Sequence, residues 1–436
     1  MNKSYRIVWN KARNCLMVVA EFASSQGKGK SVGGAVIGAV AAAVLALGSA
    51  GEASATSSNT TVNLTTGQNL SVGPNEAITV SGAEAIVGNG VTANSISVSG
   101  TVSGSPTGIA LTSAILSGGI SNTKSVSAGV TYTGTISGVG FGIKLVSSQI
   151  FGGVVNAARI YGSSAALAVL TGSTLNGALI NAGTIAAANG NGKAVFVKSS
   201  AINGGINNSG LIVGGSAIRL DNTNPAVAIN NTGRIVSDNI AITVGTSSAT
   251  LNNSATGTVV GSLLGNLDVS NSGLVALQTY NQISGTVTPN SVVHATIVGN
   301  YVQSPTGVLQ VGIASGPNYS TLSVSGSATL TNSKLRVNGT STGTAAINNV
   351  VSATSLAANG LTVVGNSAGA TYSYSILANS LSLTQTAVSV CGTLTTAYNG
   401  TCRVAFDNPT LAINGAGNQK WMGKFEQGDK WKDLLT

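Results

Sequence analysis

Residues 181–185 read Asn-Ala-Gly-Thr-Ile, and the same phrase returns at 208–212 as Asn-Ser-Gly-Leu-Ile, at 231–235 as Asn-Thr-Gly-Arg-Ile and at 271–275 as Asn-Ser-Gly-Leu-Val. A looser copy, Asn-Ser-Ala-Thr-Gly-Thr-Val at 253–259, lies between the last two, so that successive copies begin 27, 23, 22 and 18 residues apart. A period of about twenty residues is typical of solenoids, in which each repeat stacks on the next. This stretch therefore predicts a repeat architecture.

The runs between these copies indicate the kind of solenoid. Short stretches of β-branched and small residues, such as Ala-Val-Ala-Ile at 226–229 and Ala-Ile-Thr-Val at 241–244, alternate with Gly, Asn, Ser and Asp. That pattern is typical of strands separated by turns, and no window offers an amphipathic helix. Because such short strands recur at one period, we predict an all-β fold, a right-handed parallel β-helix (β-solenoid) of about fifteen coils.

The Asn and Gly of each phrase are predicted to form corners of the coils. These corner residues are Asn181, Gly183, Asn208, Gly210, Asn231, Gly233, Asn271 and Gly273. Glycine adopts the positive φ of a tight corner without strain, and asparagine tolerates the same region. The asparagine amide can bond to local backbone or to the asparagine one coil away. We therefore expect the corner asparagines to line up along the solenoid.

The composition excludes several classes of protein. Only 7% of the 436 residues are charged and 4% aromatic, whereas 43% are hydrophobic and 58 are glycine. A disordered chain would be poorer in aliphatic residues and richer in charge. The net charge of +9 divides into +4 over residues 1–55, +4 over 56–418 and +1 over 419–436. Because this charge forms no basic stripe, we exclude nucleic acid as a partner.

The N-terminus is predicted to be a targeting segment. Its basic residues are Lys3, Arg6, Lys11, Arg13, Lys28 and Lys30. The apolar run 32–47 follows them and has the length of a signal-peptide core, predicted here as a signal helix, rather than that of a membrane span. We predict cleavage after Ala55, in Ala53-Ser-Ala55, with the site ending at Ala50 as second choice. A retained membrane anchor is the alternative.

Within this leader, Met-Asn-Lys-Ser-Tyr-Arg-Ile-Val-Trp-Asn at 1–10, then Val-Ala-Glu at 19–21 and Gly-Lys at 27–28, resemble the extended signal peptide region of Gram-negative type V secreted proteins. These proteins comprise autotransporters, trimeric autotransporter adhesins and two-partner secretion exoproteins. The resemblance implies that the Sec translocon exports the chain to the periplasm. It further implies passage across the outer membrane to the cell surface or the extracellular space.

A second resemblance lies near the C-terminus. Residues 300–311, Asn-Tyr-Val-Gln-Ser-Pro-Thr-Gly-Val-Leu-Gln-Val, together with 319–330 and 334–337, are similar to the C-terminal passenger segment of autotransporters, which seeds folding outside the cell. Heptad stalks and Asn-Pro-Asn motifs, marks of the other two branches, are missing from the sequence. The family implies a C-terminal β-barrel, but only about fifty residues follow Leu383. We therefore expect this chain to lack the barrel.

We predict four segments on these grounds. They are an extended signal peptide (1–55), a parallel β-helix passenger (56–298), autochaperone-like β-helix coils (299–390), and a disulfide loop with an atypical tail (391–436). Cys391 and Cys402 lie close together in that last segment. In an oxidising periplasm such a pair forms a small disulfide loop, which stabilises the fold by about 3 kcal/mol, with free thiols as the alternative.

Candidate catalytic residues are few. Gly-Asn-Ser-Ala-Gly at 365–369 matches the nucleophile-elbow pattern around Ser367, but that motif needs a strand-to-helix turn and a histidine, and the sole histidine, His294, lies in a strand-like run. We expect no catalytic, cofactor or metal site. A polysaccharide lyase or hydrolase is the enzymatic alternative, since Asp221 and Asp238 lie about one coil apart beside Arg219 and Arg234.

The expected function is therefore that of an adhesin or structural surface protein. A long uncharged face rich in Ser, Thr and Asn would make many weak contacts with host glycans, host proteins or sister copies. Besides the enzymatic reading, a truncated remnant without function is an alternative.

Overall fold

The computed structural model describes residues 5–10, 15–20, 52–54, 57–127, 130–288, 290–315, 318–339, 345–365 and 370–387. The chain divides into two units, Met1–Ser49 and Ala50–Thr436. In the first unit, β1 (Tyr5–Asn10) and β2 (Cys15–Ala20) pair as an antiparallel hairpin. The described part of the leader is thus a pair of strands and contains no signal helix. The apolar run 32–47 lies outside the described residues.

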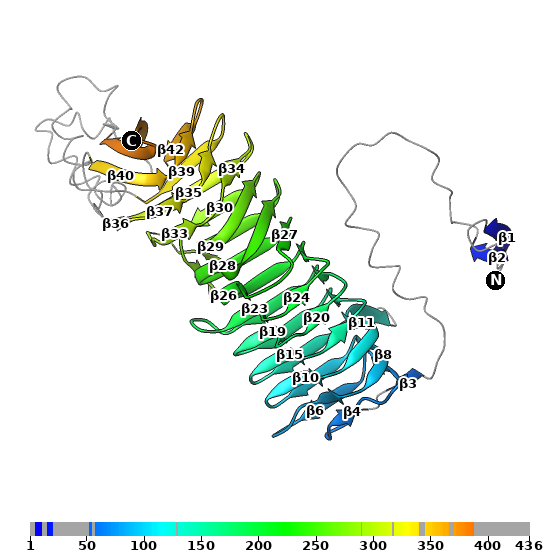
Figure 1. Ribbon diagram of the computed structural model, residues 1–436. Coiled ribbons are helices and arrows are strands. Elements are labelled where there is room, and N and C mark those ends of the chain that lie inside the picture. The colour runs from blue at the N-terminus through cyan, green and yellow to red at the C-terminus, as the bar shows by residue number, and fades with distance from the viewer. Residues whose placement is uncertain are drawn as a thin grey trace, which may run out of the picture. The chain divides into compact units, whose positions relative to one another are not determined.

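The second unit is a parallel β-solenoid of about 12 turns, somewhat fewer than the fifteen expected (Figure 1). Each coil adds one strand to each of three parallel sheets, named here face A, face B and face C. In one coil they are β21 (Leu179–Asn181) on face A, β22 (Thr184–Ala187) on face B and β23 (Lys193–Lys198) on face C. Each strand pairs in parallel with its counterparts one coil earlier and one coil later. The predicted fold class is confirmed.

The other strands of face A are β3 (Glu52–Ser54), β5 (Asn69–Val72), β8 (Thr92–Val98), β11 (Ile115–Asn122), β16 (Gln149–Ile150), β17 (Val154–Asn156), β20 (Thr174–Leu175), β24 (Ala201–Ile202), β25 (Ile206–Asn208), β27 (Val227–Asn231), β34 (Tyr301–Gln303), β38 (Ser327–Thr329) and β41 (Ser355–Ala357). Those of face B are β6 (Ala77–Val80), β9 (Thr101–Gly104), β14 (Thr135–Gly138), β18 (Arg159–Gly162), β30 (Leu274–Leu277), β35 (Val308–Ser315), β39 (Lys334–Asn338) and β42 (Thr362–Gly365).

Face C contains β4 (Val62–Asn63), β7 (Ile86–Asn89), β10 (Thr107–Thr112), β15 (Phe141–Val146), β19 (Ala165–Leu170), β33 (His294–Ile297), β37 (Thr321–Val324) and β40 (Ala345–Ser352). Three long strands bend from one face to the next. They are β26 (Leu211–Asp221), β28 (Arg234–Asn253) and β29 (Thr258–Asn271).

Alternation of inward and outward side chains builds the core, as β27 shows most regularly. In β27 the residues Val227, Ile229 and Asn231 point inward and are buried, and the residues between them are exposed. On face B a column of branched side chains fills the interior: Ile160, Ile185, Ile212, Ile235, Val259 and Val275. Stacked strands lie about 4.8 Å apart, so each such side chain contacts its equivalents in both neighbouring coils.

Antiparallel hairpins are inserted between the coils and cover the C-terminal end of the solenoid. In one inserted hairpin β12 (Lys124–Ser127) pairs with β13 (Val130–Thr133), and in another β31 (Tyr280–Asn281) pairs with β32 (Thr286–Val287). In addition, β36 (Asn318–Tyr319) folds back and pairs antiparallel with β35. At the C-terminal end β44 (Ser380–Ala387) pairs antiparallel with both β40 and β43 (Ala370–Leu377). That antiparallel pairing occupies the edge of face C that another coil would otherwise extend.

Candidate functional site: asparagine ladders and a cationic cluster

The corner asparagines form one buried column. In it the amide Nδ2 of each residue donates to the Oδ1 of its equivalent one coil later, at 2.7–2.8 Å. The column consists of Asn122, Asn156, Asn181, Asn208, Asn231, Asn253 and Asn271. None of these side chains is more than 2% exposed. The structure thus brings the four predicted corner asparagines into register with the looser copy and with two further residues.

The same amides hold the backbone of the corner. Asn181 Nδ2, for example, also approaches the carbonyl oxygens of Gly183 at 3.3 Å and Leu211 at 3.2 Å. The backbone carbonyl of Asn181 accepts the N–H groups of Ser209 and Gly210 at 2.8 and 3.0 Å. Buried polar groups must be paired or their desolvation destabilises the fold, and this network pairs them. The buried column is therefore a structural device.

The corner glycines serve a different purpose from the one predicted. Gly183, Gly210, Gly233 and Gly273 are not among the glycines with positive φ. Instead, a Cβ at Gly210 would lie 2.1 Å from the carbonyl oxygen of Gly183, and one at Gly233 would lie 2.3 Å from that of Gly210. Glycine is needed at these corners because the preceding corner approaches too closely for a Cβ, whereas the equivalent corner one coil before Gly183 accommodates Ala158.

A second ladder lies on the outside of face A. Asn230 donates to Asn207 and Asn252 donates to Asn230, both at 2.9 Å, and all three side chains are exposed or half-buried. Ser270 continues the column after Asn252. A shallow groove of about 240 Å³ runs beside this ladder, lined by Asn230, Asn231, Thr232, Asn252, Asn253, Ser254, Ser270 and Ser272. The residues that line this groove offer amide and hydroxyl groups and carry no charge, and exposed Asp268 lies nearby on the same face.

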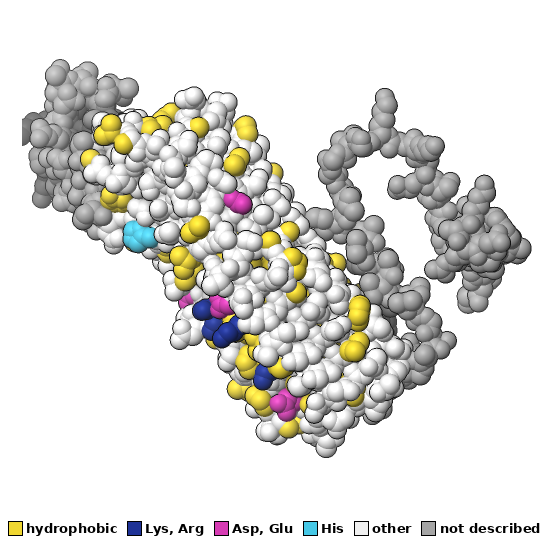
Figure 2. Space-filling model, viewed as in Figure 1, with side chains coloured by type: hydrophobic (Ala, Val, Ile, Leu, Met, Phe, Trp, Pro, Cys, Tyr) yellow, Lys and Arg dark blue, Asp and Glu magenta, His cyan; other side chains and the backbone are white. Residues whose placement is uncertain are grey.

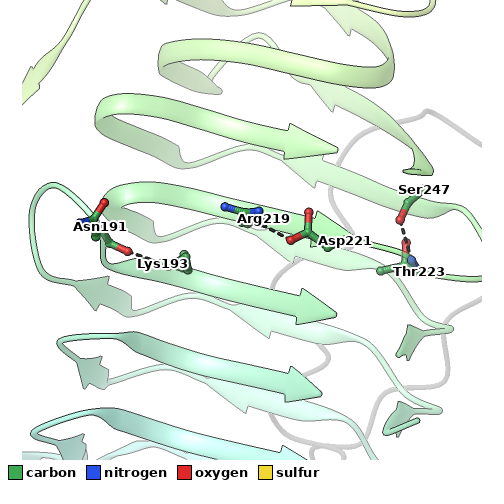
Figure 3. A network of polar contacts seen from close by, with 6 residues as sticks. All are labelled: Asn191, Lys193, Arg219, Asp221, Thr223 and Ser247. Atoms are coloured by element: carbon green, nitrogen blue, oxygen red, sulfur yellow. Dashed lines mark hydrogen bonds and ion pairs between the residues drawn. The ribbon is translucent and has the colours of Figure 1, made fainter. Parts of the chain in front are cut away.

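Another open groove, of about 360 Å³, lies at the corner between faces C and A. It is lined by Gly172, Ser173, Thr174, Ser199, Ser200, Ala201, Asn222 and Asn224. Like the first groove it presents small polar groups and no ionisable side chain. Thr223, next to it, donates its backbone N–H to Ser247 Oγ at 2.6 Å (Figure 3).

Charge is concentrated on one part of the solenoid. Figure 2 shows Lys and Arg side chains gathered near Asp and Glu over the middle of the visible face, while most of the remaining surface is uncharged. On face C, Arg219 Nε donates to Asp221 Oδ2 at 2.7 Å, and on the neighbouring strand Lys193 Nζ donates to the carbonyl of Asn191 at 2.9 Å (Figure 3). The Phe196 ring has Lys193 Nζ at 5.7 Å and Arg219 Cζ at 6.0 Å from its centroid.

The residues proposed for enzymatic chemistry do not come together. Asp221 lies at the far end of β26 on face C, whereas Asp238 lies at the corner where β28 enters face C and accepts the Gly190 N–H at 3.0 Å. Since Ser216 is opposite Ile240, strand geometry separates the two carboxylates by roughly 15 Å or more. Glycosidases need about 5–10 Å. The enzymatic alternative, which requires these acids and both arginines on one face, therefore gains no support from their placement.

The arginines are likewise on different faces. Arg234 lies on face B, where its guanidinium sits 5.1 Å from the centroid of Tyr280 and its Nη2 approaches the Gly285 carbonyl at 3.5 Å. His294 is exposed, and its Nδ1 is 2.8 Å from Thr321 Oγ1. Within the described ranges, no group of three His, Cys, Asp or Glu side chains could hold a metal ion.

Several predicted residues fall outside the described ranges. These are Ala55, Ser367, Cys391 and Cys402. The cleavage site, the nucleophile-elbow interpretation and the disulfide therefore stay predictions. No helix found within the described part of the chain has the length and apolarity to cross a membrane.

The segment Tyr301-Val302-Gln303 lies at the C-terminal end of the buried asparagine column. Gln303 takes the position of the next asparagine, with its Oε1 3.3 Å from Asn271 Nδ2, and its own Nε2 donates to Ser333 Oγ and to the Lys334 carbonyl at 2.9 Å. Tyr301 is fully buried and donates to Gln303 Oε1 at 2.8 Å. Burial raises the pKa of this phenol well above its ordinary value, against a smaller lowering by the hydrogen bond from Asn271.

Sequence reasoning missed three groups of residues. Asn122 and Asn156 belong to the buried column but lack the following Gly at the repeat spacing. The exposed ladder of Asn207, Asn230 and Asn252 was visible as a second asparagine directly before three of the five phrases. Lys193 is on the same strand as Phe196, but Arg219 is 23 residues away and reaches the ring only because β23 and β26 pair.

Comparison with known proteins identifies the leader. Residues 1–50 match the family model described as Extended Signal Peptide of Type V secretion system. Searches of the curated proteins and of the solved structures found no match. The leader engages the secretion machinery and directs export across the inner membrane, toward the cell surface or the extracellular space. The chain thus carries an extended signal peptide of type V secretion at residues 1–50, followed by a β-solenoid like that of an autotransporter passenger.

Proposed function

We propose that this passenger acts by binding rather than by catalysis, as an adhesive or structural protein at the cell surface. The observation that supports the proposal is the exposed ladder of face A, where Asn207, Asn230 and Asn252 repeat one polar group at the strand spacing. Each amide offers a donor and an acceptor to a partner. An array of identical groups suits a partner that is itself repetitive, such as a glycan or another copy of the rod.

The shape of the surface supports multivalent contact. Both grooves are open and lined by small polar residues, whereas sites for small molecules are usually apolar concavities that bury most of the ligand. Contacts that are weak singly become strong when many are made together, because the later ones form intramolecularly. A charge-poor rod with many similar coils is suited to this mode of binding.

The proposal is tested by placing a bulky charge on face A. Thr250→Arg with Ser270→Arg alters two exposed outward positions beside the ladder. Thr296→Arg with His294→Arg is the matched control, since both of its positions are exposed on face C. We expect bacteria displaying the face A variant to lose adherence to host cells or autoaggregation, and the control to retain them. Equal behaviour of both variants at equal surface amounts would contradict the proposal.

A further inference from the structure

Face C carries a concentration of positive charge that the proposed function does not use. Residues 57–387 contain nine Lys and Arg residues, and four of them lie on this face within four successive coils. We call them, with the aromatic ring between them, the cationic cluster: Lys144, Lys193, Lys198, Arg219 and Phe196. Charge so unevenly distributed in a charge-poor chain indicates an anionic partner.

The strand register sets the geometry of the cluster. Lys144, Ala168, Phe196 and Arg219 occupy one outward column in four consecutive coils, which spans about 14 Å. Ala168 is fully buried although it lies outside the core cluster, because the flanking side chains cover it. Phe196 itself stays partly exposed, with Lys193 Nζ and Arg219 Cζ 5.7 and 6.0 Å from its ring centroid.

Such a ring between cations matches two features of an acidic sugar. The C–H groups of a pyranose pack on an aromatic face, while its carboxylate accepts hydrogen bonds from Lys or Arg. Asp221, bound to Arg219 at 2.7 Å and opposite Lys198 in register, removes one unit of positive charge from the cluster. A nucleic acid, with one negative charge per ~1.7 Å of duplex, needs more cations than these four.

We propose that the cationic cluster binds an acidic polysaccharide, a chain of uronic acid sugars whose carboxylates meet Lys193 and Arg219 while a ring packs on Phe196. The inference deepens the proposed adhesive function by naming a class of partner. It concerns a face other than face A, so either proposal can fail without the other.

The test uses the full chain and polygalacturonate fragments as the probe, with binding measured by calorimetry at low and high salt. We expect binding that weakens with salt and is abolished when the probe is fully methyl-esterified, since esterification removes the carboxylates. Lys193→Gln and Phe196→Ala should each weaken binding by about tenfold, because each removes one of the recognition elements.

The matched controls lie on face B, where Arg159 sits 5.5 Å from the ring centroid of Tyr161 as an isolated pair of the same kind. Arg159→Gln and Tyr161→Ala should leave binding unchanged, and circular dichroism should show every variant folded. Undetectable binding, an equal loss in the face B variants, or equal affinity for the methyl ester would overturn the proposal. So would equal affinity for single-stranded DNA of the same charge.

Discussion

At the scale of single residues, the buried asparagine column has a direction. Every amide donates toward the C-terminal end, so the first member, Asn122, has an Oδ1 that is buried without a partner. The residue in register one coil earlier is Val98, which cannot donate. A polar column inside an aliphatic core thus ends where the sequence changes from asparagine to valine. Unpaired buried acceptors typically cost about 1–3 kcal/mol.

Val98→Asn should extend the column by one step. Its Nδ2 would donate to Asn122 Oδ1, which offsets the loss of a buried valine, so we expect a change in the free energy of unfolding within about 1 kcal/mol. Val102→Asn, at an equally buried position away from the column, should destabilise by roughly 2–4 kcal/mol. Guanidinium midpoints of the two variants measure the difference. Equal destabilisation would show that the column gains nothing from extension.

Gly210→Ala tests the close approach of the corners. The new Cβ would lie 2.1 Å from the Gly183 carbonyl oxygen, so the coils must separate and we expect a loss of about 3 kcal/mol or more. Gly172→Ala isolates backbone strain, because φ is +74° there and nothing lies within 4 Å of the added Cβ. That variant should lose only about 1–2 kcal/mol. A larger loss at Gly172 would refute the steric explanation.

The burial of Tyr301 predicts that the folded protein loses stability at alkaline pH. Its pKa is raised by burial, so the phenol is neutral in both folded and unfolded chains below pH ~10 and its stabilisation is complete there. Above that pH the unfolded chain ionises first, and stability falls as pH rises toward the folded pKa. Tyr301→Phe should lower stability at pH 7 by about 1 kcal/mol and flatten the decline above pH 10. Thermal melts from pH 7 to 11 measure this decline. If Tyr301→Phe loses stability with pH as steeply as the unaltered protein, the prediction is wrong.

At the scale of elements, the β31–β32 hairpin covers an apolar strip on the outside of face B. Ala186, Val213, Val236, Val260 and Ala276 form this strip, and Tyr280 packs on it with only 5% of its surface exposed. Outward positions on a solenoid face are normally solvated, so the hairpin and the strip depend on each other. Arg234 fixes the hairpin from the side through its contact with the Tyr280 ring.

Tyr280→Ala should release this hairpin. Removing the ring leaves the strip exposed, and we expect increased binding of a hydrophobic dye and cleavage near Ile283, which is 94% exposed at the hairpin tip. The remaining coils should keep their β circular dichroism. Phe141→Ala, at a half-buried position on face C, is the control. Resistance of the Tyr280 variant to limited proteolysis would mean that the hairpin is held by other contacts.

At the scale of the whole molecule, the solenoid is quasi-one-dimensional, because each coil contacts only its neighbours. Deleting residues 182–208 removes one coil and joins Asn181 to Ser209, which restores the Asn-Ser-Gly-Leu-Ile phrase and lets Asn181 meet Asn231. We expect a folded protein with the β content reduced in proportion. Deleting 182–194 instead breaks the register and should aggregate or unfold. Circular dichroism and gel filtration distinguish the outcomes, and loss of folding in both deletions would contradict the stacking account.

The sequence by itself determined the coil and the export route. The Asn-x-Gly phrase and the alternating aliphatic residues are local, so they specified the strands, the corners and the inward side chains. The leader is a contiguous sequence motif, so it could be identified without knowledge of the fold. Likewise Tyr301 and Gln303 could be singled out as a pair, although their role at the end of the buried column could not.

Only the tertiary structure decided which residues meet across coils. Irregular coil lengths, from 18 to 27 residues between corner asparagines, hide the register. The sequence therefore left open a stack of Asp221 and Asp238, which in fact lie at opposite ends of face C. The same irregularity concealed the approach of Lys193 and Arg219 to Phe196. The corner glycines show the reason most plainly. Glycine is required there because the neighbouring coil leaves no room for a Cβ, and a local preference for particular backbone dihedrals does not reveal that requirement.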